Sequence, residues 1–166
     1  MREDCRVSQE NLSHVDGAGK LKMVDVSRKD PTRRVARAMC LVITSTTLDA
    51  LVAQAADPDV IQSARLSGIQ AAKQTSNLIP LCHPMGLDNI GVEVLNHERG
   101  LEVRSSVTTV SRTGVEMEAL VACAFCALSL LDSLVGLDRN SRLAELTVLA
   151  KSGGKSDWGR EVSSTE

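Results

Sequence analysis

Residues 115–135 read VEMEALVACAFCALSLLDSLV, and this stretch decides the fold of the chain. Small and apolar side chains occupy nearly every face of the helix that their spacing predicts, and Gly136 follows as a C-terminal stop. A helix that is apolar all round has to be buried on most of its sides. The stretch therefore predicts a central helix that packs against a sheet and against further protein.

The segments around this helix alternate between strand and helix patterns. β-branched and alternating apolar residues predict strands over 36–44, 91–95, 101–110 and 143–150. Helical spacing predicts a short helix over 46–55 and a longer one from Pro58 to Asn77. The predicted order is β-α-β-β-α-β, an α+β fold of the ferredoxin-like split β-α-β type, with an antiparallel sheet packed by two main helices.

One domain is expected, since 166 residues with 43% hydrophobic content suffice for one sizeable core. We expect residues 1–30 to form an N-terminal arm or peripheral strands, residues 31–156 the ferredoxin-like domain and residues 157–166 a flexible tail. A sheet of about four strands cannot cover a helix that is apolar all round. Oligomerisation is therefore expected.

Composition excludes several classes of function. Aromatic residues make up 1% of the chain and the net charge is -2, which argues against a nucleic-acid partner. No apolar run reaches the roughly 18 residues that span a bilayer, and the N-terminus lacks a signal-peptide stretch, so we expect a cytoplasmic protein with no membrane partner. The five cysteines lie mostly in apolar segments, as reduced core thiols do.

Cys82 and His83 stand side by side between two prolines in LIPLCHPMG, residues 78–86. Adjacent side chains in an extended segment before proline point to opposite faces, so only one of the two is expected to face a site. This argues against a Cys-His nucleophile pair. His83 is then either a positioned hydrogen-bond donor or proton carrier, or a histidine that caps a turn.

A metal site at Cys82 and His83 would need two further soft ligands. Cys123 and Cys126 have the spacing of a zinc or redox pair, but they lie in the middle of the apolar helix, where no cation favours the thiolate. We therefore interpret both as small core residues and predict no metal site.

Two acids, Glu116 and Glu118, open the central helix. They either complement the helix dipole or hydrogen-bond a polar heterocycle beside the histidine loop. Asp132 lies between apolar neighbours, where a lone acid is costly unless it has a partner. It follows Glu118 by fourteen residues, which is about 21 Å along a helix. Glu118 and Asp132 therefore have different functions, or they meet at a site shared between chains.

KSGGKS, residues 151–156, resembles the end of a phosphate loop, but Leu149 stands where a Walker A motif needs glycine. Its two lysines around two glycines still offer cations and backbone N–H groups to an anion, and a solvated tail is the alternative. The candidate cations of the chain are Lys73, Lys151 and Lys155, together with Arg33 and Arg34.

Four segments combine these motifs: HVDGAGKLKMVDVSRKDPTRRVARA (14–38), ARLSGIQAAKQTSNLIPLCHPMGL (64–87), TGVEMEALVACAFCALSLLD (113–132) and KSGGKS (151–156). In this order they resemble the cyclic pyranopterin monophosphate synthase family of molybdenum-cofactor biosynthesis. The resemblance implies a homo-hexamer, a trimer of dimers, with sites at subunit interfaces. It implies a lyase reaction on a cyclised GTP-derived substrate, a purine or pterin nucleotide, with release of pyrophosphate and without a metal or other cofactor.

The resemblance also implies roles for particular residues. Asp132 matches the catalytic aspartate of the family. The residues that it implies for substrate binding are His83, Cys82, Pro84, Glu116, Met117, Glu118, Lys73, Lys151 and Lys155.

Two positions depart from the family pattern. The family has a catalytic lysine one helical turn after the aspartate, where this chain has Val135, and another before the 64–87 segment, where it has Asp57. Arg139 keeps its proton at working pH, so it could bind phosphate but not shuttle protons. Two hypotheses follow: an enzyme that performs the same or an altered rearrangement, or a non-catalytic member that binds the ligand or a hetero-oligomeric partner.

Overall fold

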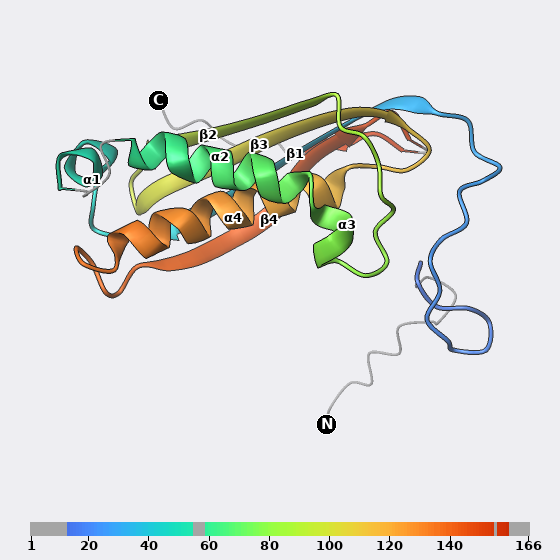
Figure 1. Ribbon diagram of the computed structural model, residues 1–166, viewed down its shortest axis with the longest axis horizontal. Coiled ribbons are helices and arrows are strands. Elements are labelled where there is room, and N and C mark those ends of the chain that lie inside the picture. The colour runs from blue at the N-terminus through green and yellow to red at the C-terminus, as the bar shows by residue number, and fades with distance from the viewer. Residues whose placement is uncertain (1–12, 55–58, 155, 160–166) are drawn as a thin grey trace.

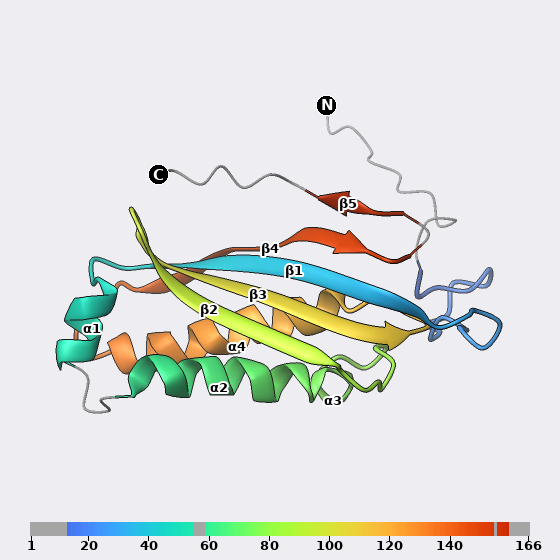
Figure 2. The ribbon, with the colours of Figure 1, turned by 90° about the horizontal axis from the view of Figure 1, so that it is seen from above.

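The computed structural model describes residues 13–54, 59–154 and 156–159. Within them it has a sheet on one side and helices on the other (Figures 1 and 2). The elements in chain order are β1 (Thr32–Ile43), α1 (Leu48–Gln54), α2 (Val60–Ala72), α3 (Thr75–Leu78), β2 (Asn89–His97), β3 (Gly100–Ser111), α4 (Glu116–Leu134), β4 (Arg142–Ser152) and β5 (Trp158–Gly159).

The sheet has the order β2-β3-β1-β4-β5, and every neighbouring pair is antiparallel. β1 pairs with β3 along its whole length, from Thr32 opposite Ser111 to Ile43 opposite Gly100. β3 therefore lies between β1 and β2, which α2 connects, and this is the split β-α-β arrangement. The predicted α+β fold, an antiparallel sheet packed by two main helices, is confirmed.

Two elements differ from the sequence prediction. The predicted helix from Pro58 to Asn77 is two helices, α2 and α3, and Pro58 lies outside the described residues. The hydroxyl of Thr75 donates a hydrogen bond to the Ala72 carbonyl at 2.9 Å, which competes with the helical ladder at the break. Trp158–Gly159, expected in the tail, pairs with β4 as the two-residue strand β5.

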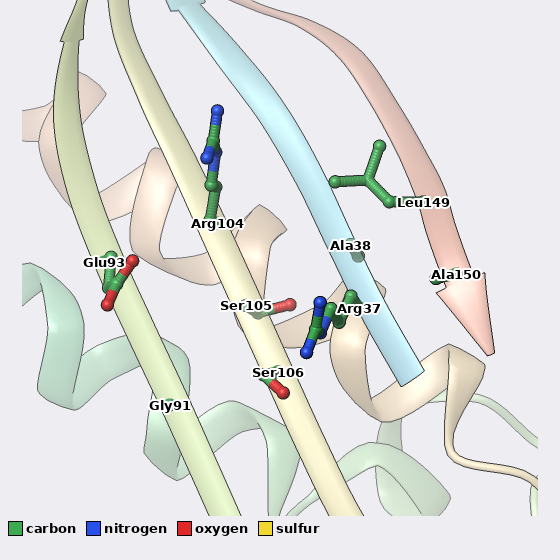
Figure 3. Close-up of a pocket in the computed structure, with 9 residues that line it drawn as sticks. All are labelled: Arg37, Ala38, Gly91, Glu93, Arg104, Ser105, Ser106, Leu149 and Ala150. Carbon is green, nitrogen blue, oxygen red and sulfur yellow. The ribbon is translucent and has the colours of Figure 1, made fainter. Parts of the chain in front are cut away.

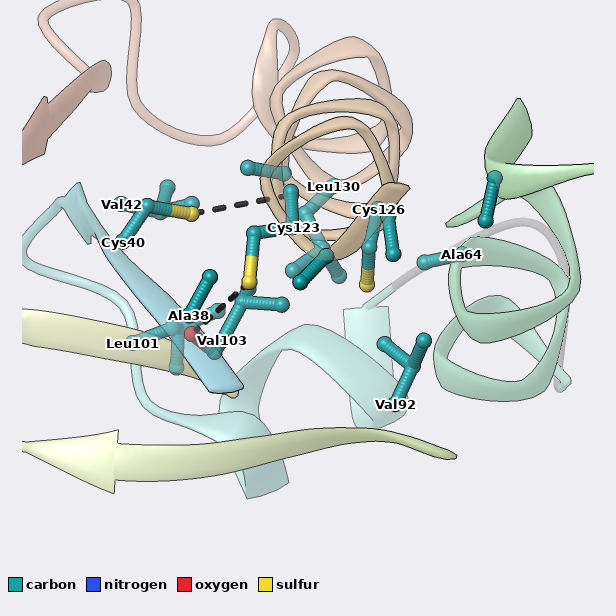
Figure 4. Packing of buried hydrophobic residues seen from close by; sticks show 14 of the residues in the cluster. Ala38, Cys40, Val42, Ala64, Val92, Leu101, Val103, Cys123, Cys126 and Leu130 are labelled. Carbon is teal, nitrogen blue, oxygen red and sulfur yellow. Dashed lines mark hydrogen bonds between the residues drawn. The ribbon is translucent and has the colours of Figure 1, made fainter. Parts of the chain in front are cut away.

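The core lies between the sheet and the paired helices α2 and α4 (Figures 2 and 4). Alternate residues of β1 point into it and are fully buried: Ala36, Ala38, Cys40 and Val42. The two helices approach closely at Gly68, where a Cβ atom would lie 2.5 Å from the carbonyl oxygen of Ala122. Only glycine permits this approach, and it brings α4 into the middle of the fold.

α4 is covered on one face only. Leu128 and Val135 are 50% and 61% exposed, whereas Ala122, Cys126 and Leu130 are buried. α4 is long and apolar enough to cross a membrane. Our expectation that no apolar run reaches the roughly 18 residues of a membrane span therefore does not hold for this helix. Half of the stretch is buried inside the protein, as in the core helix of a globular domain. The burial expected on its other sides is not supplied within one chain.

Hydrogen bonds of two side chains connect the helical layer to the sheet. Arg65 on α2 donates a hydrogen bond from Nε to the carbonyl of Val92 on the outer strand β2, at 2.7 Å. The carboxylate of Asp138, after α4, accepts hydrogen bonds from the amide and hydroxyl of Ser45 and from the hydroxyl of Thr44. These bonds and that from the Asn140 amide hold the pKa of Asp138 at about 2.

Candidate functional site

Two adjoining cavities open where α4 begins. The first, which we call the histidine cavity, has a volume of about 310 Å³, and the second, the lysine cavity, has about 390 Å³. They share the lining residues Ser13, Lys29, Thr113, Gly114 and Glu116. One continuous site therefore extends from the N-terminal arm across the start of α4 to the end of β4.

Gly114 permits the turn that joins the two cavities. A Cβ atom at this position would lie 1.9 Å from Oε2 of Glu116, so only glycine lets the Glu116 side chain fold back over the backbone. In this position its Oε1 lies 3.0 Å from Nζ of Lys151, which comes from the end of β4. The pair marks the boundary between the histidine cavity and the lysine cavity.

The lysine cavity is rich in cations, with Lys29, Arg34, Arg112 and Lys151 in its lining. The loop after β4 packs tightly against the start of β1: Gly153 has a φ of 87°, and a Cβ there would lie 1.7 Å from the Arg33 carbonyl oxygen. Nε of Arg34 is buried with no hydrogen-bond partner among the described residues. This arrangement suits a multiply charged anion.

The histidine cavity brings together Cys82, His83, Glu116, Met117 and Glu118. Glu118 is 3% exposed, and burial raises its pKa to about 6. Burial also raises the pKa of the Cys82 thiol, and the negative charge of Glu118 adds to this. A weakly acidic carboxyl beside a histidine can hold or move a proton.

Cys82 and His83 both line this cavity, so both residues border the candidate site. The loop that carries them is not extended throughout. The amide of Cys82 donates a hydrogen bond to the Ile79 carbonyl at 3.0 Å, which closes a turn over residues 79–82. His83 follows this turn directly.

Two predicted site residues do not join this group within one chain. Lys73, at the C-terminal end of α2, and Pro84 are exposed and line neither cavity. Lys155 and Asp57 lie outside the described residues.

Asp132 lies near the opposite end of α4 from Glu118, as the predicted separation requires. It lines a different, shallow cavity of about 350 Å³ with Leu128, Val135, Asp138 and Arg139 among the neighbours. The side chain is exposed, so it carries no burial penalty within one chain, contrary to our expectation. Glu118 and Asp132 thus belong to separate cavities of the same subunit.

Sequence reasoning missed three lining residues, His14, Lys29 and Arg112. Arg112 directly precedes the Thr113-Gly114 turn, and His14 and Lys29 belong to the arm. Their positions in or beside the recognised motifs were the signal by which the sequence could have identified them. Their distance in sequence from residues 81–85 concealed that they share one cavity.

The cysteines of the core are packing residues. Cys40 and Cys123 are fully buried between β1 and α4, and Cys126 is fully buried on the side of α4 that faces α2 (Figure 4); burial raises the pKa of Cys126 to about 12. Cys123 contacts the hydroxyl of Ser105 at 3.2 Å. Within the described ranges, no group of three or more histidine, cysteine, aspartate or glutamate side chains could hold a metal ion.

A larger cavity of about 460 Å³ lies on the sheet face that points away from the helices (Figure 3). Arg104 lines it, but this guanidinium is paired with Glu102 and lies opposite Glu93 on the neighbouring strand. None of the predicted site residues lines this cavity. The chemistry of the chain is concentrated at the start of α4 instead.

Comparison with known proteins gives one consistent result. The model of the MoaC family matches residues 23–154. A cyclic pyranopterin monophosphate synthase from Streptomyces griseus is 42% identical over 90% of this chain and 85% of its own length. Cyclic pyranopterin monophosphate synthase 1 from Mycobacterium tuberculosis is 42% identical over 92% of both chains. The synthase from a Nostoc species is 44% identical over 88% of this chain and 89% of its own.

Proposed function

Because this chain belongs to the MoaC family, we propose that it is a cyclic pyranopterin monophosphate synthase, a lyase of molybdenum-cofactor biosynthesis. Its substrate is a cyclised GTP derivative, which it rearranges with release of pyrophosphate. It works in the cytoplasm, without a cofactor, a membrane or a nucleic acid.

The observation that carries the proposal is the pair of adjoining cavities at the start of α4. The lysine cavity offers four cationic side chains, which suits the phosphates of a nucleotide. The histidine cavity offers two histidines, a thiol and two carboxyl groups, which suits the hydrogen-bonding edge of a purine or pterin ring. A nucleotide would lie with its phosphates toward Lys151 and its ring toward Glu118.

We propose that the working unit is a homo-hexamer, in which Asp132 of one subunit completes the site of another. Two observations support this: Asp132 and Glu118 belong to separate cavities within one chain, and α4 leaves Leu128 and Val135 exposed beside Asp132. Light scattering should give a mass near six subunits. A stable monomer in dilute solution would contradict the shared site.

Assaying the full-length protein with enzymatically made cyclised GTP tests the function. Formation of cyclic pyranopterin monophosphate together with pyrophosphate is expected. The second candidate is a ligand-binding or hetero-oligomeric member without catalysis. It is favoured by Val135, a non-ionisable side chain 61% exposed in the Asp132 cavity. Binding of the substrate without turnover would support this candidate instead.

A further inference from the structure

We propose that Glu118 serves as a neutral hydrogen-bond donor at the floor of the histidine cavity, presenting its carboxylic proton to a ring oxygen or nitrogen of the bound heterocycle. Glu116, its neighbour in the first turn of α4, is instead the partner of Lys151. The assignment rests on the proposed function only for the class of ligand.

The two acids differ in their surroundings. The Glu116 carboxylate has a cation 3.0 Å away, and its side chain is 30% exposed. Glu118 is 3% exposed, and none of the salt bridges within the described part of the chain includes it. A buried carboxylate without a cation is costly, whereas the neutral acid is not. The structure therefore separates an exposed acid with a cation partner from a buried acid that favours its protonated form.

The ionisable groups that line the histidine cavity with Glu118 come from each element around it. They are Cys82 and His83 from the loop before β2, Glu116 from α4, and His14 and Lys29 from the arm. Burial is the main cause that raises the pKa of Glu118 to about 6, a hydrogen bond with its own backbone amide opposes this, and the negative charge of Glu116 adds to it. The nearest paired cation, Lys151, is already engaged by Glu116.

A donor at this place matches the chemistry of the ligand. Purine and pterin rings carry carbonyl oxygens and imine nitrogens, which accept hydrogen bonds, and an ionised carboxylate can only accept. A ligand acceptor placed against Glu118 therefore stabilises the protonated acid. Above pH 6, binding of the ligand must then be coupled to uptake of a proton.

Calorimetric titration of the full-length protein with GTP tests this coupling between pH 7.5 and 8.5, in two buffers of different ionisation enthalpy. Wild type should take up close to one proton more than Glu118→Gln, and its affinity should fall by about tenfold over that pH unit relative to the variant. Glu118→Gln keeps an N–H donor but cannot ionise, so its affinity should not follow this slope. Glu118→Met, which lacks a donor at similar length, should bind more weakly than Glu118→Gln.

Glu116→Gln is the matched control, because it removes the neighbouring charge from the same helical turn. It should retain the proton uptake of wild type. Equal uptake by wild type and Glu118→Gln would overturn the assignment, and so would equal GTP affinity of Glu118→Gln and Glu118→Met. The wild-type slope is a test that does not depend on the folding of any variant.

The same measurements distinguish failure of this assignment from failure of the proposed function. GTP binding without proton uptake, in a protein that converts cyclised GTP, overturns the assignment alone. Proton uptake with GTP in a protein that does not convert cyclised GTP supports the assignment and overturns the synthase function. Absence of GTP binding by wild type overturns the assignment, whereas the assay with cyclised GTP alone decides the synthase function.

Discussion

Nζ of Lys151 lies 3.0 Å from the carboxylate of Glu116, and this contact joins the end of β4 to the first turn of α4. Both side chains are about one-third exposed, at 33% and 30%, so the pair contributes little to the stability of the fold. Its effect is on position: it holds an ammonium group at the boundary of the two cavities. A ligand phosphate that enters the lysine cavity meets a cation already in place.

Replacing Lys151 by alanine should therefore weaken binding of GTP by roughly 1–2 kcal/mol, a factor of about 5 to 30, because a charge-assisted contact is lost. The effect should shrink as salt is raised, since ion pairs are screened. Calorimetry at low and high salt measures both. Lys22→Ala, an exposed lysine that lines neither cavity, is the control and should bind like wild type. Equal affinity of Lys151→Ala and wild type at low salt would contradict the prediction.

Glu118→Gln should make the protein more stable at pH 8 by roughly 1–2 kcal/mol and leave stability at pH 4 unchanged. The folded-state pKa of Glu118, about 6, lies above the ordinary value of 4.5. The neutral acid therefore carries no penalty below pH 4.5, and a destabilising penalty develops as pH rises through 6. Urea unfolding of both proteins at the two pH values measures the difference. A variant less stable than wild type at pH 8 would show that the ionised acid has a favourable partner.

Gly68→Ala should destabilise the fold by roughly 1–3 kcal/mol, as overpacked cores do. The added methyl group would lie 2.5 Å from the Ala122 carbonyl oxygen and 3.1 Å from Cβ of Cys126, so α2 and α4 would have to move apart. Gly136→Ala is the matched control, because a Cβ there meets nothing within 4 Å. Thermal unfolding of the two variants should show a lower midpoint for Gly68→Ala alone.

Val135→Lys combined with Asp57→Lys should raise product formation from cyclised GTP by about 10²-fold or more over wild type, because a positioned general acid or base contributes on that scale. Val135 is 61% exposed in the same cavity as Asp132, so the added ammonium has room and a carboxylate neighbour. Each single change should do less, since groups in one proton-transfer sequence are not additive. Asp57 lies outside the described residues.

Val135→Arg is the control for that variant, since arginine keeps the charge but does not give up its proton. It should not raise product formation. A wild-type protein that already turns over as fast as the double variant would show that these two positions do not decide the chemistry.

The main elements of the fold were predictable because their patterns are local. The β-branched run over residues 36–44 predicts a strand where β1 lies, and the apolar faces of 115–135 predict a central helix. The break between α2 and α3 was not predictable from periodicity, which does not register the single hydrogen bond from the Thr75 hydroxyl to the Ala72 carbonyl at this point. β5 was missed because two residues become a strand only when β4 lies beside them.

The candidate site was predictable in its residue types but less so in its geometry. Glu116 and Lys151 were both identified, yet their contact depends on how β4 returns beside the start of α4. The Cys82-Ile79 hydrogen bond forms a turn in a segment that the prolines suggested was extended, so the shape of this loop was not predicted. Contacts between segments that are far apart in the sequence, and turns closed by one hydrogen bond, leave no periodic signal in a sequence.

The hydrogen bond from Arg65 to the Val92 carbonyl limits how copies of this protein can meet. It occupies a backbone acceptor on the outer strand β2, and at the opposite edge the described strand β5 has two residues. An acceptor that a side chain occupies is closed to an added strand, so this bond makes growth by strand addition at β2 less favourable. Exposed helix side chains such as Leu128 offer another contact surface, and contacts of that kind can close into a finite particle.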